Sequence, residues 1–129
     1  MVRRARCCCG RTTIAVDGEP RIHGICHCDD CKKRTGSAFG WSAYFLDSQI
    51  LETSGETSAY RVDGTNPQER FFCQVCGSTL FWKSAAFDKM TGVAGGCFVE
   101  PMLPEPGLTL SNESRCAWVS LPDHWQSNL

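Results

Sequence analysis

The chain has 129 residues, which is enough for one domain, spanning 1–129, with a hydrophobic core of its own. Its formal net charge of −1 argues against a nucleic-acid partner, and no stretch approaches the roughly 20 consecutive apolar residues that cross a membrane. The basic start at Arg3, Arg4 and Arg6 runs into cysteines without an apolar segment, so it is not a secretory signal. We therefore expect a cytoplasmic protein with no membrane partner.

The predicted elements are mostly strands, because the apolar residues alternate over short stretches that are bounded by Gly, Pro, Asn and Asp. In chain order, strands are predicted at residues 12–16, 41–46, 58–62, 69–73, 78–83, 89–94 and 108–110. One short helix is predicted at residues 29–35, after the second group of cysteines, with Gly36 at its C-terminal end. The sequence thus predicts a mainly β protein.

Ten cysteines in a chain of this length indicate either a disulfide framework or metal binding. Disulfide frameworks belong mainly to secreted chains, and adjacent Cys7, Cys8 and Cys9 are poorly placed to bridge one another, so metal binding is favoured. Seven cysteines fall into three groups with the spacing of metal ligands: Cys7 and Cys9; Cys26, Cys28 and Cys31; and Cys73 and Cys76. Seven is one short of two closed tetrahedral sites, which predicts one complete site and one with an open position.

Cys7, Cys9, Cys73 and Cys76 are predicted to form the complete site. Gly77 follows the Cys-x-x-Cys pair and permits the positive φ of a turn that wraps around a metal. On an extended strand, Cys7 and Cys9 lie on one face and can reach the same ion. Four thiolates in a closed site favour zinc in a structural role.

Cys26, Cys28 and Cys31 are predicted to form the open site. Cys26 and Cys28 share one face of an extended segment, and Cys31 follows by three residues, the spacing that brings side chains together on a helical turn. His27 is an alternative fourth ligand, but strand alternation turns it to the opposite side. The fourth position is therefore expected to hold water or a substrate atom.

The charge of this open site indicates its chemistry. Three thiolates around Zn²⁺ leave a formal charge of about −1, which makes the ion a weak Lewis acid for activating water. Exchange of a further soft sulfur ligand suits such a site better. We therefore expect a thiol substrate.

A basic run, Lys32, Lys33 and Arg34, directly follows the open site. It could bind the carboxylates of an acidic thiol such as glutathione. The alternative is a solvated helix end that complements the helix dipole, as Asp29 and Asp30 would do at the other end.

Three motifs in this order resemble one family. They are Cys-x-Cys-Gly at 7–10, Cys-His-Cys-x-x-Cys-Lys-Lys-x-x-Gly-Ser at 26–37 and Phe-Cys-x-x-Cys-Gly-x-x-Leu at 72–80. The chain resembles the glutathione-dependent formaldehyde-activating family, also called S-(hydroxymethyl)glutathione synthase, whose domain is shared with centromere protein V. Weaker similarities lie at 99–101 and 115–118. The order of the three motifs is far more specific than any single cysteine pair.

The resemblance implies several coiled β-sheets around zinc, the Mss-four-like fold, and two zinc ions per chain, the second site partly or fully filled. The ligands that it implies are Cys7, Cys9, Cys73 and Cys76 for a structural zinc and Cys26, Cys28 and Cys31 for a catalytic zinc. The implied activity is that of a carbon–sulfur lyase, in which the sulfur of glutathione, a co-substrate, is joined to formaldehyde. Small thiols and aldehydes are thus the expected partners.

Other interpretations stay open. In one, the zinc ions only stabilise a non-catalytic domain that binds another protein. In another, Cys116 beside Arg115 is the reactive thiol of a methionine sulfoxide-type reductase, which leaves the Cys26–Cys28–Cys31 group unexplained. Buried packing is the expectation for the three cysteines outside the groups, which are Cys8, Cys97 and Cys116.

Overall fold

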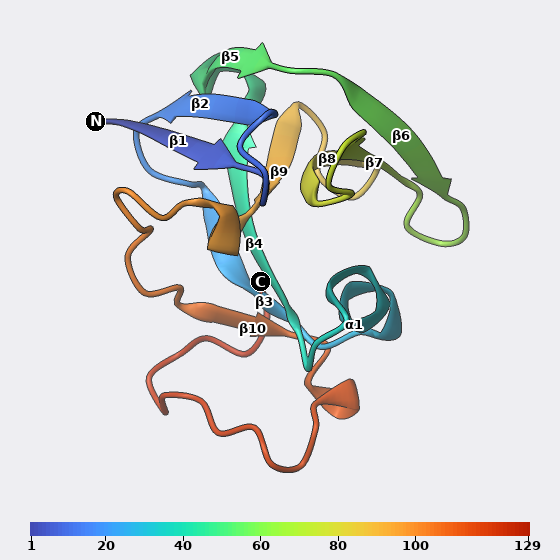
Figure 1. The fold of residues 1–129 in the computed structure, drawn as a ribbon. Coiled ribbons are helices and arrows are strands. Elements are labelled where there is room, and N and C mark those ends of the chain that lie inside the picture. Colours follow the sequence, from blue (N-terminus) through green and yellow to red (C-terminus); the bar gives the residue numbers. More distant parts are fainter.

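The structure, a computed structural model, describes residues 1–129 as two open β-sheets with short helices at their margins (Figure 1). The smaller sheet has the strand order β1–β2–β5, formed by Val2–Arg6, Thr13–Asp17 and Ile50–Ser54. The larger has the order β10–β3–β4–β9–β8–β7–β6. In chain order, its strands are β3 (Ile22–Cys26), β4 (Gly40–Leu46), β6 (Thr57–Val62), β7 (Gln68–Cys73), β8 (Thr79–Ser84), β9 (Met90–Ala94) and β10 (Leu108–Leu110). Every strand pair is antiparallel except β10 with β3.

The helical segments are short. The single α-helix is α1 (Asp29–Thr35), and three 3-10 turns are η1 (Asp47–Gln49), η2 (Gly95–Cys97) and η3 (Asn112–Ser114). The mainly β fold and the helix after the second cysteine group are therefore confirmed. None of these helices has the length and apolar character that crossing a membrane requires.

The hydrophobic core joins the two sheets. Ile14 and Val16 of β2 pack with Phe45 of β4, Leu80 of β8 and Val93 of β9, and all five side chains are fully buried. Burial of each such side chain contributes about 1.5–3 kcal/mol relative to leaving it exposed. The core therefore fixes the smaller sheet against one end of β4, and the second cysteine group lies near the other end, where Cys26 of β3 is opposite Gly40.

Strands β1, β3 and β5 are not among the predicted strands. In β1 the burial alternates, so that Arg3 and Ala5 face inward while Val2, Arg4 and Arg6 are exposed. The buried guanidinium of Arg3 is compensated, because its Nη1 donates to Glu19 Oε1 at 3.1 Å. The basic start is thus a strand, and its three arginines conceal the alternation of burial because one of them, Arg3, faces inward.

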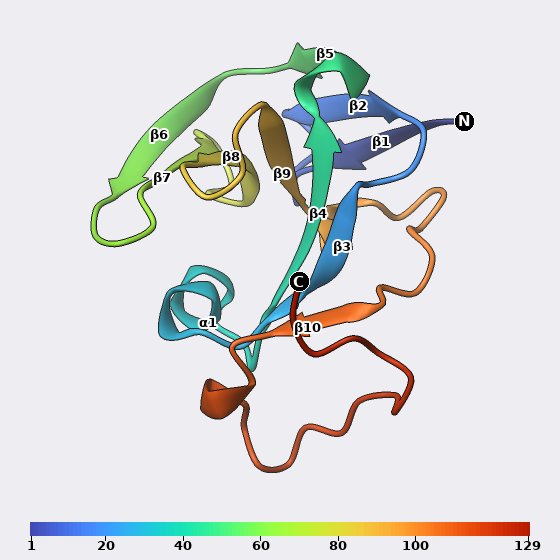
Figure 2. The same cartoon turned by 180° about the vertical axis from the view of Figure 1, so that it is seen from behind.

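The corner between β3 and α1 positions the second cysteine group. Cys26 ends β3, and Cys28 is the N-cap of α1, with its Sγ accepting a hydrogen bond from the Cys31 backbone N–H. Gly36 adopts the left-handed conformation, with φ of 62°, and ends the helix where the sequence predicts. Figures 1 and 2 show α1 and β10 at the same end of β3 and β4, away from the smaller sheet.

Candidate metal centres

The first candidate centre joins two turns that are far apart in the sequence. The sulfur atoms of Cys7, Cys9, Cys73 and Cys76 all lie within 4.8 Å of one another. Cys9 Sγ is 3.6 Å from Cys7 Sγ and 3.7 Å from Cys73 Sγ. Zn–S bonds of about 2.3 Å in a tetrahedron place ligand sulfurs about 3.8 Å apart. Both the donor set and the spacing therefore fit a zinc ion.

The backbone of the first pair differs from the sequence expectation. Cys7 to Gly10 forms a turn rather than an extended strand, with the Gly10 N–H donating to the Cys7 carbonyl at 3.0 Å and a φ of 81° at Gly10. The second pair has a turn of the same kind, in which the Gly77 N–H donates to the Cys73 carbonyl at 2.9 Å and Gly77 has a φ of 77°. The predicted extended strand at Cys7 and Cys9 is therefore wrong. A turn that ends at Gly10 brings the two sulfur atoms together instead.

Polar groups around this centre favour ionised sulfur. The Val75 backbone N–H donates to Cys73 Sγ at 3.4 Å. Cys76 Sγ lies 3.3 Å from Ser78 Oγ, and this hydrogen bond lowers the pKa of Cys76 to about 5. Such hydrogen bonds to thiolates orient the ligands and help to hold them charged.

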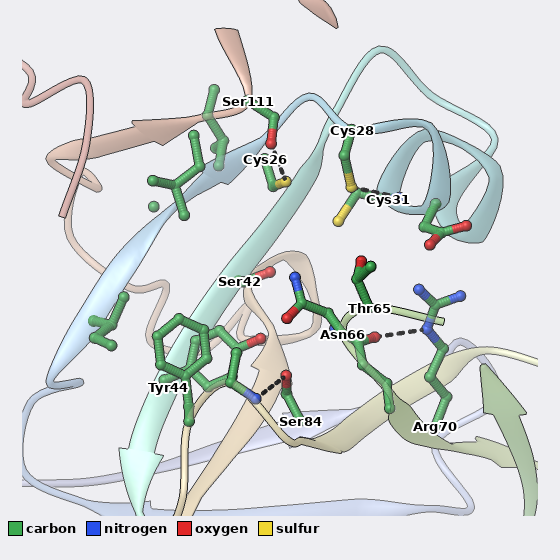
Figure 3. Close-up of a pocket in the computed structure, with 18 of the residues that line it drawn as sticks. Cys26, Cys28, Cys31, Ser42, Tyr44, Thr65, Asn66, Arg70, Ser84 and Ser111 are labelled. Atoms are coloured by element: carbon green, nitrogen blue, oxygen red, sulfur yellow. Dashed lines mark hydrogen bonds between the residues drawn. The ribbon is translucent and has the colours of Figure 1, made fainter. Parts of the chain in front are cut away.

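The second candidate centre consists of three cysteines. The sulfur atoms of Cys26, Cys28 and Cys31 lie within 4.8 Å of one another at the β3–α1 corner (Figure 3). The Cys31 backbone N–H donates to Cys28 Sγ at 3.4 Å, and Ser111 Oγ lies 3.7 Å from Cys26 Sγ. No fourth cysteine, histidine or carboxylate joins this group. We call these three cysteines the triplet.

The triplet sulfurs compete for charge. A hydrogen bond with Cys31 lowers the pKa of Cys26 to about 5. The same hydrogen bond is the main reason that the pKa of Cys31 is raised, and burial of Cys31 is the second reason. Burial also raises the pKa of Cys28. Like charges this close cannot all be ionised without a cation between them. The donor set therefore fits a soft divalent cation such as zinc, with three protein ligands.

A cavity of about 470 Å³ opens beside the triplet. Cys26, Cys28 and Cys31 lie at one end of it, and Thr65, Asn66 and Arg70 lie across from them (Figure 3). The rest of the lining includes an apolar wall of Ile22, Ile25, Ala86, Phe87, Leu108 and Leu110. The open side of the triplet thus faces a space large enough for a small organic molecule.

Arg70 and Ser111 are among the polar cavity residues that are absent from the sequence predictions. Arg70 is only 9% exposed, and its one side-chain hydrogen bond runs from Nε to Gln68 Oε1 at 3.1 Å. Ser111 reaches Cys26 because β10 pairs in parallel with β3, with Leu110 opposite Cys26, and because Ser111 has a φ of 57°. Arg70 lies in an ordinary strand pattern and the β3–β10 pairing is long-range, so neither residue carries a local sequence signal.

The basic run after the triplet lies outside the lining of this cavity. Lys32 Nζ donates to the carbonyl oxygen of Ser114, and Lys33 is exposed. The guanidinium carbon of Arg34 lies 4.2 Å from the centre of the Trp82 ring. The side chains of these three cations therefore lie in three different environments, and they do not form one binding site in the structure.

His27 lies apart from the triplet sulfurs, as strand alternation predicts. Its side chain is fully buried, and Nε2 lies 3.0 Å from Thr109 Oγ1. Because the Thr109 hydroxyl donates to Asn112 Oδ1 at 2.8 Å, it accepts from His27 Nε2. The expectation of buried packing is wrong for Cys8, which is exposed, whereas Cys97 and Cys116 are half-buried and Cys97 packs against the hydrophobic core.

Comparisons with known proteins agree with this architecture. The family model described as glutathione-dependent formaldehyde-activating enzyme matches residues 2–112. A protein of Halomonas elongata, which provisionally carries the same name, is 26% identical over 135 residues that cover 98% of this chain and 85% of that protein. A crystal structure of a Rhodobacter sphaeroides protein superimposes with a TM-score of 0.62 at 21% identity, covering 78% of this chain and 91% of that one, and so supports the fold.

The matched range includes all seven cysteines of the two centres. It also includes the β3–α1 corner and the strand β10 that brings Ser111 to the triplet. The chain belongs to the glutathione-dependent formaldehyde-activating enzyme family.

Proposed function

We propose that this chain is a zinc-dependent enzyme that adds glutathione, or a similar thiol, to formaldehyde or a related small electrophile, and that also catalyses the reverse release. This is a reaction of the carbon–sulfur lyase type. One observation carries the proposal. The triplet supplies three sulfur ligands and opens on a cavity of about 470 Å³, whereas the other centre has four ligands. Family membership supports glutathione and formaldehyde as the substrates.

The two centres divide the work. Cys7, Cys9, Cys73 and Cys76 hold a structural zinc, because a closed set of four thiolates leaves no position for a substrate. Cys26, Cys28 and Cys31 hold the second zinc. A zinc ion bound there would supply a soft Lewis acid that keeps an incoming thiol ionised at neutral pH.

The reaction forms one C–S bond and changes no oxidation state. The thiol proton leaves to solvent, and the sulfur lone pair attacks the carbonyl carbon of formaldehyde. The carbonyl π pair becomes an alkoxide, which takes a proton from water and yields the hydroxymethyl thioether. Ser111 lines the cavity beside Cys26, so its hydroxyl is placed to donate a hydrogen bond to this oxygen. Holding the two reactants side by side supplies the remaining acceleration.

Arg70 is our candidate for the residue that binds a glutathione carboxylate. It is the one cation that lines the cavity, and its guanidinium makes no ion pair with the protein's own carboxylates. A guanidinium can bind a carboxylate through two parallel hydrogen bonds. The prediction that Lys32, Lys33 and Arg34 bind these carboxylates stays a prediction, and the cavity lining favours Arg70.

Exchange spectroscopy by NMR tests the proposal, because it measures how fast glutathione and formaldehyde interconvert with their adduct. We expect the zinc-loaded protein to accelerate this exchange and the Cys28→Ser variant to lose the acceleration. Cys116→Ser is the matched control, since Cys116 is half-buried and lies outside both centres, and it should retain the acceleration.

Two outcomes would contradict the proposal. If the zinc-loaded protein leaves the exchange rate unchanged, a non-catalytic domain stabilised by zinc becomes the better interpretation. If activity survives Cys28→Ser and disappears in Cys116→Ser, the reactive group is a cysteine outside the triplet.

A further inference from the structure

Arg34 is a half-buried cation that the proposed reaction does not use. It lies in the last turn of α1, three residues after Cys31, yet its side chain turns inward rather than into solvent. Its Nη2 atom is buried and has no hydrogen-bond partner. Arg34 also forms no ion pair with a carboxylate. A buried guanidinium nitrogen without a hydrogen-bond partner is costly, so a compensating negative charge is expected close by.

The guanidinium has a defined position. It lies over the face of Trp82, with Cζ 4.2 Å from the ring centre, a cation–π arrangement. Trp82 is itself only 2% exposed, and its Nε1 donates to Tyr44 Oη at 2.9 Å. Gly92 of the neighbouring strand leaves room for this ring, because a Cβ at Gly92 would overlap the indole. Trp82 therefore holds the guanidinium of Arg34 in place, and Tyr44 and Gly92 hold the indole ring of Trp82.

The neighbour that can compensate this charge is the triplet. A Cβ placed on Gly40 would lie 2.6 Å from Arg34 Nη2 and 3.2 Å from Cys31 Cβ, so both groups lie against the same side of Gly40. A divalent cation bound by the three thiolates would form a complex with a formal charge of about −1, and a fourth thiolate would bring that complex to about −2. The guanidinium of Arg34, next to Cys31, offsets one of the negative charges of this complex.

We propose that Arg34 is a positioning residue of the triplet, whose guanidinium, held on Trp82 beside Cys31, offsets the thiolate charge and so favours an anionic fourth ligand over a neutral one. The assignment rests on the proposed function only in taking that fourth ligand to be a thiol sulfur. It explains why the guanidinium of Arg34 lies on Trp82 while Lys33 stays exposed. It also assigns Arg34 a role through Cys31 rather than through direct contact with substrate.

The test uses the full chain with zinc in the four-cysteine centre and Co²⁺ in the triplet, because cobalt–thiolate absorption reports each added ligand. At pH 8, 2-mercaptoethanol serves as the ligand that binds as an anion, and imidazole as the neutral ligand. We expect Arg34→Gln to weaken 2-mercaptoethanol binding about 10-fold or more, the effect of an opposite charge within a few ångströms. Imidazole binding should change less than about 2-fold, since a neutral ligand adds no charge.

Two further variants separate charge from packing. Arg34→Lys keeps the charge and should recover part of the 2-mercaptoethanol affinity, although it lacks the planar contact with Trp82. Arg4→Gln removes an exposed charge from strand β1 of the smaller sheet and should behave like the wild type. Circular dichroism and retention of the structural zinc show that each variant is folded.

The assignment is overturned if Arg34→Gln binds 2-mercaptoethanol as tightly as the wild type, or if it loses both ligands equally, which would indicate a packing role. Should the wild type itself bind no 2-mercaptoethanol, the Co²⁺ affinities decide, because charge compensation also predicts at least about 10-fold weaker Co²⁺ binding by Arg34→Gln. Equal Co²⁺ affinities would then overturn the assignment. A wild type that binds 2-mercaptoethanol but leaves the glutathione–formaldehyde exchange unaccelerated contradicts the proposed function alone.

Discussion

Single residues give this cavity its polarity. The sulfur atoms of the triplet lie at one end and the guanidinium of Arg70 lies opposite, with an apolar wall of β3 and β10 residues beside them. A molecule that carries a thiol at one end and a carboxylate at the other matches this polarity, and glutathione is such a molecule. Arg70 is therefore the residue whose substitution should separate one thiol from another.

Arg70→Gln should raise the KM for glutathione about 10- to 100-fold, because it removes a charged hydrogen bond of about 1.5–3 kcal/mol to the substrate carboxylate. The KM for 2-mercaptoethanol, which has no carboxylate, should stay within about 2-fold. Steady-state kinetics with both thiols measures this. Arg61→Gln is the matched control, because Arg61 is an exposed arginine on the neighbouring strand β6. Equal losses for the two thiols would contradict a carboxylate role for Arg70.

At the scale of elements, one carboxylate ties three segments together. Asp47 begins η1, and its Oδ1 accepts from Lys83 Nζ of β8 at 2.6 Å and from Thr91 Oγ1 of β9 at 2.8 Å. The hydrogen bond with Lys83 is the main reason that the pKa of Asp47 lies below its ordinary value of 3.8. The stabilisation is therefore present at pH values above the unfolded pKa and is lost only as pH falls through the lower folded value.

Asp47→Asn should lower the free energy of unfolding by about 0.5 kcal/mol, a small amount because the pair is half exposed. The loss should be the same at pH 6, 7 and 8, since the carboxyl is ionised in both states throughout that range. Urea unfolding at these three pH values measures it. Asp88→Asn, at an exposed aspartate that makes no side-chain hydrogen bond, should leave stability unchanged. A loss that fades between pH 8 and pH 6 would show that another titrating group is responsible.

How far the sequence predicts these elements depends on the range of the interactions. Local patterns predict α1 with its end at Gly36, and the strands with alternating apolar residues. The β1 strand is not predicted, because three of its five residues are arginines and the inward position of Arg3 depends on Glu19. The β10–β3 pairing joins residues more than 80 positions apart, so Ser111 could not be assigned to the triplet. Cysteine spacing indicated both centres although the backbone at Cys7–Gly10 is a turn rather than a strand, because either conformation brings Cys7 and Cys9 together.

At the scale of the whole molecule, the four-cysteine centre is a cross-link. Cys9 and Cys73 are 64 residues apart, and the ion between them would hold the turn after β1 against the turn after β7. The triplet, in contrast, lies within six consecutive residues of one corner. Loss of the first centre should therefore affect the whole fold, while loss of the second should stay local.

Cys73→Ser should lower the urea concentration at the unfolding midpoint by several M or leave the chain unfolded, because structural zinc binding contributes directly to the folding free energy. Cys28→Ser should keep a midpoint close to that of the wild type and lose only thiol binding. Urea unfolding followed by circular dichroism compares the two variants. If Cys28→Ser unfolds like Cys73→Ser, the division between a structural and a catalytic centre is wrong.

We infer that this chain holds one closed zinc site and one zinc site that accepts a thiol. A native mass spectrum of the purified protein, recorded with and without glutathione, tests this claim most directly. We expect two zinc ions per chain and one bound glutathione, with Cys28→Ser retaining one zinc ion and no glutathione. A single zinc ion with no glutathione adduct in the wild type would contradict an open, thiol-binding second site.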